Sequence, residues 1–385
     1  CQVSQPKFGY GAILLFIFFS RALLPMTLGT VSYVLPFPEI YKSVSSAEVG
    51  FRPDRECCLC PKAARILFHP NPKDGREKTS HATVVGREFA KTMSRDTGPH
   101  IFMVIAPGKQ LTDHQACSVE SAALHHPGHN VHLLLLDEPY RAHSYIDVGR
   151  ITHLSHIKNV RLWHIETADI FSGSPLQDWY YNEFMRMSFR GDPNRIIMDV
   201  VKVLLLWKFG GIILDPDFVV LKTLDDDKHN NAIVVDGENF PMTHFLGFQK
   251  NSKILSTWMK EFEASYNAHG EHDPGSVILM RSIRSVCNIS ALDEVDVRGC
   301  KLTVIKSRYF FPVHQKEAAD MFKNDRDMTP VLKNSLAVWL WSDRVRIHQN
   351  NMDSSSYRQL MRDNCPTIDF QNGMYVYKGG SHSEM

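Results

Sequence analysis

Two carboxylates stand one residue apart at the end of an apolar run near the middle of the chain. In WKFGGIILDPDFVVL, residues 207–221, Asp215 and Asp217 interrupt aliphatic side chains. A buried carboxylate needs a compensating partner, because it is costly to bury unpaired. Residues i and i+2 of an extended chain point the same way, and Pro216 restricts Asp215 to extended geometry. We expect Asp215 and Asp217 to converge on Mn²⁺ or Mg²⁺, since these cations prefer hard oxygen ligands and can carry a substrate diphosphate.

Two further charges lie in the segment before this pair. Residues 193–211, PNRIIMDVVKVLLLWKFGG, predict a buried helix that stops at Gly-Gly, because the run is apolar nearly all round. Asp199 and Lys202 interrupt it three residues apart, close enough to pair with each other. The alternative is that both point into a polar site at the sheet edge. On that alternative, Asp199 and Lys202 bind the diphosphate substrate together with Asp215 and Asp217.

Alternating strand and helix patterns must position these residues. Apolar runs predict strands and a helical spacing predicts a helix, in the order strand 100–108, helix 113–127, strand 130–138, strand 160–167 and strand 212–214. This order is typical of an α/β domain with a mainly parallel central sheet. Ligands of open α/β sheets bind at the carboxyl ends of the strands, where Asp215 and Asp217 follow theirs.

Composition narrows the class of protein. Of the 385 residues, 43% are hydrophobic and 22% charged, as in a globular protein. Lys and Arg number 43 against 42 Asp and Glu, and no basic stripe with interleaved aromatics is visible. We therefore expect no nucleic-acid partner.

The N-terminal region predicts a membrane anchor. Residues 8–37 are mainly apolar and carry a single charge, Arg21, and about 20 apolar residues span a bilayer. We expect an uncleaved signal anchor within residues 1–37, with a cleaved signal peptide as the alternative. Residues 38–96 read as a luminal stem, because they are rich in Pro, Ser and charges. A catalytic domain at 97–375 and a tail at 376–385 complete the predicted organisation.

Cysteine usage agrees with a translocated chain. Four of the eight cysteines are widely spaced and can form two disulfides in three ways: Cys117, Cys287, Cys300 and Cys365. Asn288-Ile-Ser290 is a glycosylation sequon. The histidines at 125, 126, 129 and 132 straddle a Pro-Gly turn and cannot share one helix face. We expect them to lie in a solvated loop rather than in a metal site.

Several segments together resemble one family. WKFGGIILDPDFVVLKTL is similar to the motif of the alpha-1,4-glycosyltransferases typified by lactosylceramide 4-alpha-galactosyltransferase, within the wider Asp-x-Asp sugar-transferase group. Further landmarks follow in the family's order over about residues 100–370: CSVESAALHHP (117–127), SPLQDWY (174–180), RYFFPV (308–313) and Cys365-Pro366.

The resemblance implies a reaction and a location. It implies a retaining, metal-dependent transfer of galactose or an N-acetylhexosamine from a UDP-sugar to a galactose-terminated glycolipid or glycan. It also implies a GT-A type of fold and a single-pass type II protein of the Golgi membrane with a luminal catalytic domain. A covalent nucleophile is not marked by a motif; the weak candidates are Asp236, Glu238 and Asp273.

The chain departs from the family pattern at several positions. Met198 and Lys202 stand where the family has Ser and Arg, and Met280 stands where Thr is expected. Trp339 replaces a histidine that completes the metal site in related folds, and an indole offers no metal ligand. One alternative is therefore a pseudoglycosyltransferase with a binding or chaperone role; a diphosphate-hydrolysing protein is a third. Trp339 itself is open to three readings, which are a degraded metal site, a surface on which the sugar or uracil stacks, and a plain core residue.

Overall fold

The computed structural model describes residues 88–137, 148–186, 193–224, 231–265, 275–292, 300–342, 344–345 and 354–368. All of them fall within one compact unit of the chain, residues 59–385. Within these ranges, no helix is long and apolar enough to cross a membrane. The anchor predicted within residues 8–37 lies outside the described residues, so it stays a prediction.

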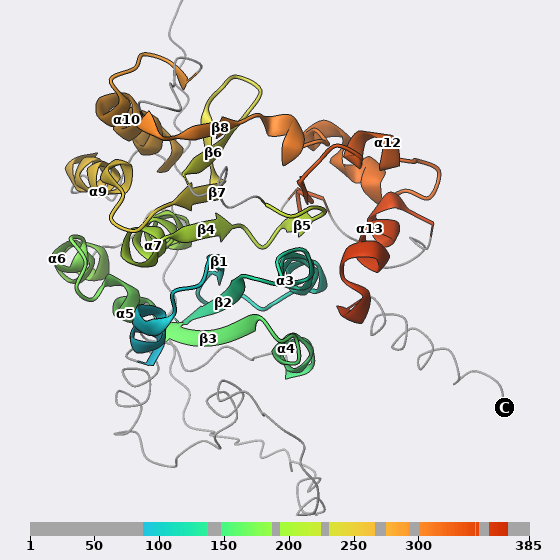
Figure 1. The fold of residues 1–385 in the computed structure, drawn as a ribbon, viewed down its shortest axis with the longest axis horizontal. Coiled ribbons are helices and arrows are strands. Elements are labelled where there is room, and N and C mark those ends of the chain that lie inside the picture. Colours follow the sequence, from blue (N-terminus) through green and yellow to red (C-terminus); the bar gives the residue numbers. More distant parts are fainter. Residues whose placement is uncertain are drawn as a thin grey trace, which may run out of the picture. The chain divides into compact units, whose positions relative to one another are not determined.

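A seven-stranded sheet forms the centre, in the order β3-β2-β1-β4-β7-β6-β8 (Figure 1). Its strands are β1 (His100–Ile105), β2 (Asn130–Asp137), β3 (Val160–Glu166), β4 (Gly211–Leu214), β6 (Ala232–Val235), β7 (Pro241–Phe248) and β8 (Thr303–Ile305). β7 runs antiparallel to β4 and β6, and the other pairings are parallel. The prediction of an α/β domain with a mainly parallel sheet is confirmed.

Helices cover both faces of this sheet. The α-helices are α3 (Asp113–His125), α4 (Val148–Ser155), α5 (Thr167–Phe171), α6 (Gln177–Asn182), α7 (Pro193–Phe209), α9 (Lys253–Ser265), α10 (Gly275–Cys287), α12 (Thr329–Leu332) and α13 (Ser356–Asn364). Short 3₁₀ helices are η1 (Phe184–Arg186), η3 (Ser307–Tyr309) and η4 (Gln315–Phe322). The strands and helices predicted over residues 100–167 and 193–214 are confirmed in type and order.

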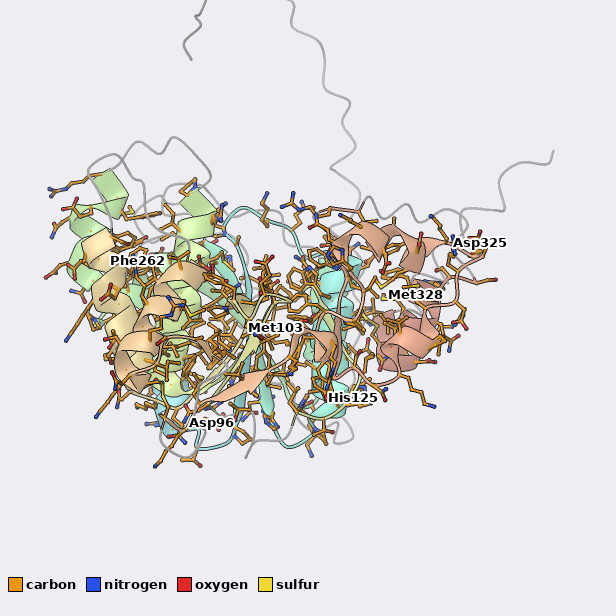
Figure 2. All side chains as sticks on the ribbon, turned by 90° about the horizontal axis from the view of Figure 1, so that it is seen from above. Asp96, Met103, His125, Phe262, Asp325 and Met328 are labelled. Atoms are coloured by element: carbon orange, nitrogen blue, oxygen red, sulfur yellow. A yellow bond between two sulfur atoms is a disulfide. The ribbon has the colours of Figure 1, made fainter. Side chains whose placement is uncertain are left out.

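The sheet separates two hydrophobic cores. On one face α5, α6, α7, α9 and α10 pack over side chains such as Phe102 and Ile213, and on the other α3, α4 and α13 pack over Met103 and Leu214. Met103 lies in the middle of the packed side chains in Figure 2, with Phe262 of α9 to one side and Met328 to the other. Successive residues of a strand alternate between faces, which accounts for the division.

The folded part begins earlier than the predicted stem boundary at residue 96. A helix spans 88–95, and its Phe89 and Met93 are both 4% exposed. Phe89 packs edge-on against Trp163 and Phe209, with ring centroids 5.1 and 5.6 Å apart. The helix was not predicted from the sequence, because only its buried face carries apolar side chains and polar and charged residues lie between them.

The Gly-Gly stop after α7 is required by backbone geometry. Gly210 and Gly211 have φ values of 73° and 110°, which residues with a side chain rarely adopt. A Cβ on Gly211 would lie 2.5 Å from the carbonyl oxygen of His100. The two glycines therefore let α7 turn directly into β4 beside β1, as predicted.

The chain leaves the large sheet directly after β4. The amide of Phe218 donates to the carbonyl oxygen of Asp215 at 3.1 Å, so residues 215–218 form a turn. The following strand, β5 (Phe218–Val220), pairs with β9 (Ala337–Trp339) in a separate two-stranded sheet. The expectation that Asp215 and Asp217 lie in extended backbone and point the same way is wrong, because this turn intervenes.

The segment 117–127 holds β5 in place. In α3, the hydroxyl of Ser118 donates to the carbonyl oxygen of Phe218, and that of Ser121 accepts from the amide of Val220 at 3.0 Å. The carboxylate of Glu120, which is 2% exposed, accepts from the amides of Thr367 and Ile368. The hydrogen bonds of Ser118 and Ser121 therefore fix α3 to β5, the strand that follows Asp217.

Two disulfides form among the four widely spaced cysteines. Cys117 of α3 bonds Cys365 beyond α13, and Cys287 bonds Cys300. The Cα atoms are 5.1 and 5.3 Å apart, within the usual range for a disulfide, so the structure selects one of the three pairings left open by the sequence.

Three of the four clustered histidines are buried, so the expectation of a solvated loop is wrong. His126, His129 and His132 are 1, 8 and 0% exposed. His126 accepts from the amide of Leu224 through Nε2 and lies 2.8 Å from the carbonyl oxygen of Ala122 through Nδ1. The imidazoles replace backbone hydrogen bonds that a loop would otherwise leave unmade.

Candidate functional site

The acidic turn lies at the carboxyl edge of the parallel strands. β1 and β4 are parallel neighbours, so the loop after β1, the N-terminus of α3 and the turn after β4 meet at this edge. The amide of Asp215 donates to the carbonyl oxygen of His244 in β7 at 2.9 Å. This is the edge where open α/β sheets bind ligands.

Lys202 of α7 pairs with Asp215 rather than with Asp199. Its Nζ lies 2.9 Å from Oδ2 of Asp215, whereas Asp199 accepts from the amide of Gly275 at 3.3 Å. The predicted ion pair within the helix is therefore wrong, and both charges reach outward to other elements. Burial alone would lower the pKa of Lys202, but the carboxylates of Asp215 and Asp199 outweigh it and raise the pKa. Lys202 is thus a permanent cation beside Asp215.

Asp217 is held from a different side. Its side chain is 9% exposed, and Oδ2 accepts from the amide of Ser342 at 3.0 Å. Its own carbonyl oxygen accepts from the amide of Leu340. The segment after β9 therefore orients this carboxylate, while Lys202 orients Asp215.

A histidine that the motif search missed lies beside Asp217. Nε2 of His114, in the first turn of α3, lies 3.7 Å from Oδ1 of Asp217 and 3.0 Å from Oγ1 of Thr112. Burial lowers the pKa of His114 to about 4, although Asp113 opposes this shift. The imidazole is therefore neutral near pH 7. Inspecting the first residues after every predicted strand would have found it, since they gather at this edge.

Trp339 is a core residue. It is 8% exposed and packs edge-on against Phe218 and His244, with ring centroids 4.8 and 4.4 Å apart. Phe311 and Trp341 complete the aromatic cluster. Of the three readings of this position, the packing favours the core, because little of the ring is left for a sugar or a base to stack on.

The weak candidates for a nucleophile lie at the same edge or outside the described residues. Asp236 follows β6, and its Oδ1 accepts from the amides of Glu238 and Phe240, both at 2.8 Å. This carboxylate therefore builds the turn between β6 and β7, and Glu238 is an exposed residue of that turn. Asp273 lies outside the described residues.

The donor set at this edge suits a divalent cation in its chemistry. Carboxylate oxygens from Asp215 and Asp217 and the imidazole of His114 are ligands that Mn²⁺ accepts. Across the described ranges, the only three such groups with ligand atoms all within 4.8 Å of one another are Asp96, His100 and His132. A cation at the acidic turn would therefore need oxygens of the substrate or water to complete its coordination.

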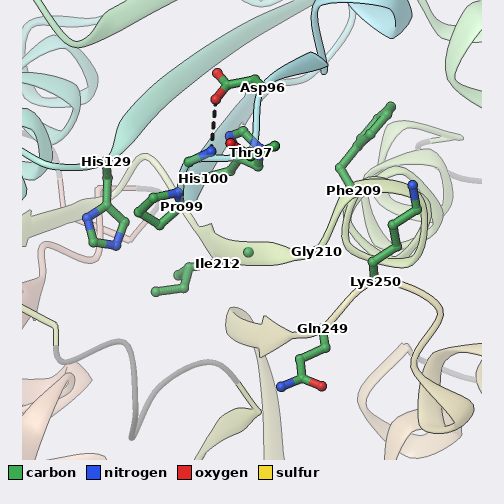
Figure 3. Close-up of a pocket in the computed structure, with 12 residues that line it drawn as sticks. Asp96, Thr97, Pro99, His100, His129, Phe209, Gly210, Ile212, Gln249 and Lys250 are labelled. Carbon is green, nitrogen blue, oxygen red and sulfur yellow. Dashed lines mark hydrogen bonds between the residues drawn. The ribbon is translucent and has the colours of Figure 1, made fainter. Parts of the chain in front are cut away.

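A pocket of about 460 Å³ opens at the opposite end of β1 and β4 (Figure 3). It is lined by Asp96, His100, His129, Phe209, Ile212 and Lys250, among others. The carboxylate of Asp96 accepts from the amide of Gly98 at 3.0 Å and from Nδ2 of Asn130 at 2.7 Å. The pocket is separated from the acidic turn by the length of the strands.

Proton positions argue against a metal among Asp96, His100 and His132. Trp163 donates to Nδ1 of His132 at 3.0 Å. A neutral His132 must then carry its proton on Nε2, which donates to Nδ1 of His100 at 3.2 Å. Nε2 of His132 and Nδ1 of His100, the two nitrogens that would face a cation, are thus bonded to each other. The group is a buried polar network that satisfies itself.

This network predicts a loss of stability in acid. Burial lowers the pKa of His132 to about 3, from an ordinary value of 6.5. Between these values the unfolded chain binds the proton and the folded chain does not, so stability falls as the pH drops below 6.5, by up to about 1.4 kcal/mol per unit. Urea unfolding at pH 7 and pH 5 measures this. His132→Leu should reduce the pH dependence without abolishing it, because burial also lowers the pKa of His114 to about 4. A change at the exposed His156 is the control.

Core packing predicts the result of restoring a histidine at position 339. Trp339→His leaves a cavity among Phe218, His244 and Phe311 and should lower the free energy of unfolding by about 2–4 kcal/mol. Thermal unfolding without and with Mn²⁺ measures the loss and any compensation by the metal. A variant as stable as the wild type that gains stability with Mn²⁺ would show that position 339 faces the metal site instead.

Comparison with known proteins found a matching family region and several similar proteins. Residues 247–369 match the alpha 1,4-glycosyltransferase conserved region. Lactosylceramide 4-alpha-galactosyltransferase of Rattus norvegicus is 28% identical over 266 residues, covering 68% of this chain and 72% of the relative. Alpha-1,4-N-acetylglucosaminyltransferase of Homo sapiens is 24% identical over 291 residues, covering 73% of this chain and 78% of the relative. The solved structure of galactosyltransferase LgtC with donor and acceptor sugar analogs is 11% identical with a TM-score of 0.35, covering 71% of this chain and 95% of that one.

Proposed function

The chain belongs to the alpha-1,4-glycosyltransferase family, and from that premise we propose that it moves galactose or an N-acetylhexosamine from a UDP-sugar to a galactose-terminated glycolipid or glycan. We further propose that the transfer retains the configuration of the donor sugar and requires Mn²⁺ or Mg²⁺. The observation that supports the cation is the acidic turn itself, in which Asp215 and Asp217 lie at the ligand-binding edge and are oriented by separate partners, Lys202 and the amide of Ser342.

Asp217 and Oδ1 of Asp215 would hold the cation, since Oδ2 of Asp215 is bound to Lys202. The cation, when bound, offsets the negative charge that grows on the departing UDP. Lys202 holds the carboxylate of Asp215 in place, and the amide of Ser342 does the same for Asp217. Asp199 fixes the start of α10 through the amide of Gly275, beside the same edge.

A donor screen tests the proposal. The purified full chain is incubated with lactosylceramide, Mn²⁺ and one of three donors, UDP-galactose, UDP-N-acetylgalactosamine or UDP-N-acetylglucosamine. We expect transfer from one of them and loss of transfer with a chelator. Transfer that continues undiminished in the chelator would refute the metal requirement, and no transfer from any donor to any galactose-terminated acceptor would refute the proposed reaction.

We also propose a Golgi membrane location with residues 38–385 in the lumen. In support, Asn288 of the sequon is exposed, and the four widely spaced cysteines form disulfides, which persist in oxidising compartments. In cells, glycosidase treatment should increase the gel mobility of the wild type but not of Asn288→Gln, and the protein should stay in the membrane pellet at high pH. Release into the soluble fraction would favour the cleaved signal peptide.

A further inference from the structure

We propose that His114 is a ligand of the divalent cation, which it shares with Asp217. This inference rests on the proposed function, because it assumes that a cation binds at Asp215 and Asp217. It adds a ligand from a different element, α3. It also distinguishes the two aspartates, because Asp215 pairs with Lys202 whereas Asp217 lies beside His114.

The spacing of the two side chains supports a shared cation. Nε2 of His114 and Oδ1 of Asp217 are 3.7 Å apart. This distance is too long for a hydrogen bond, whose donor and acceptor lie about 2.7–3.2 Å apart. Two atoms that each lie about 2.1 Å from one cation are at most about 4.2 Å apart. The pair can therefore hold an ion between them once Nε2 of His114 exchanges its contact with Oγ1 of Thr112, 3.0 Å away, for the cation.

The helix that carries His114 is fixed against the strand that follows Asp217. His114, Ser118 and Ser121 are spaced at i, i+4 and i+7, which places them on one face of α3. The two serines bond the backbone of Phe218 and Val220. Because Phe218 adjoins Asp217, these bonds set the distance between the imidazole and the carboxylate. Such support from rigid elements is what a metal site requires.

The other groups near Asp217 are less suited to complete the site. Lys202 holds Oδ2 of Asp215 at 2.9 Å and brings a positive charge that repels a cation on that side. Trp339 offers an indole N–H, which is a donor and cannot ligate. His114 places a ring nitrogen 3.7 Å from Oδ1 of Asp217, so the cation is expected between these two atoms.

The identity of the ligands also predicts which cation binds. An imidazole among carboxylate, diphosphate and water oxygens suits Mn²⁺ better than Mg²⁺ or Ca²⁺, because imidazole is a poor ligand for the harder ions. Removal of His114 should therefore weaken Mn²⁺ binding more than Mg²⁺ binding, and should narrow the difference between the two metals.

Direct metal binding tests this proposal. Free Mn²⁺ is measured by electron paramagnetic resonance during titration of the purified full chain with and without UDP. We expect His114→Ala to raise the Mn²⁺ concentration at half-saturation by about tenfold or more, and His114→Asn to do the same while retaining a polar side chain. The matched control is His156→Ala, since His156 is exposed just beyond α4. Circular dichroism melting without metal checks that each variant folds.

The outcomes separate this proposal from the proposed function. Mn²⁺ binding that is weakened in both His114 variants and unchanged in His156→Ala supports the ligand. Mn²⁺ binding that vanishes in Asp217→Asn but is unchanged in the His114 variants overturns the ligand and leaves the metal-dependent reaction in place. Absence of Mn²⁺ binding by the wild type, with UDP bound equally well in a chelator, overturns the metal dependence and the ligand together.

Discussion

Asp217→Asn should reduce sugar transfer at least about a hundredfold and remove Mn²⁺-dependent affinity for UDP. The carboxylate is 9% exposed and bound by the amide of Ser342 at 3.0 Å. Asparagine has the same shape and keeps an oxygen for that amide, so the change removes the charge and preserves this contact. Transfer rate and calorimetric titration of UDP with and without Mn²⁺ measure the two effects.

The matched control for Asp217→Asn is Asp236→Asn, since Asp236 follows another strand at the same edge and accepts hydrogen bonds from the amides of its own turn. Its oxygen remains as an acceptor in the variant, and Mn²⁺-dependent UDP affinity should be as in the wild type. Full transfer by Asp217→Asn, or equal loss of UDP affinity in both variants, would contradict the assignment of the metal to Asp217.

Lys202→Met should lower the free energy of unfolding by about 3–5 kcal/mol, because it leaves the charge of Asp215 partly buried without its partner. The side chains of Lys202 and Asp215 are 7 and 20% exposed, and their charged atoms are 2.9 Å apart. Methionine fills nearly the same volume as the lysine stem, so lost packing contributes little. Urea unfolding measures the difference.

A second substitution distinguishes lost charge from lost packing in Lys202→Met. The double variant Lys202→Met with Asp215→Asn removes both charges and should recover most of the stability, since the uncompensated carboxylate is gone. It should not recover transfer. A double variant as unstable as Lys202→Met would show that the lysine stabilises α7 by packing and not through Asp215.

The order of the elements was predictable because it depends on local patterns. Continuous apolar runs marked β1, β2, β3 and β4, and the Gly-Gly pair marked the end of α7. These signals need only the period of the side chains and the backbone freedom of glycine. The position of the acidic turn at the carboxyl edge followed from the same patterns, because a parallel sheet places the ends of its strands together.

The partners of the charged residues depended on the tertiary structure. Helical spacing suggested that Lys202 pairs with Asp199, yet the sheet brings Asp215 to 2.9 Å from it. His114 lies beside Asp217 only because α3 packs on β5, which no local pattern encodes. Likewise, Trp339 is a core residue because β9 pairs with β5, which places Trp339 opposite Phe218.

The sequence by itself determined the fold class, the succession of strands and helices, and the place of Asp215 and Asp217 directly after a buried strand, because periodicity, glycine stops and strand ends are local properties of the chain. Only the tertiary structure decided that Asp215 belongs to Lys202 and Asp217 to the side of His114, and which cysteines join. Electrostatic pairs and disulfides form between groups a few ångströms apart in space, and that proximity is a property of the packed molecule.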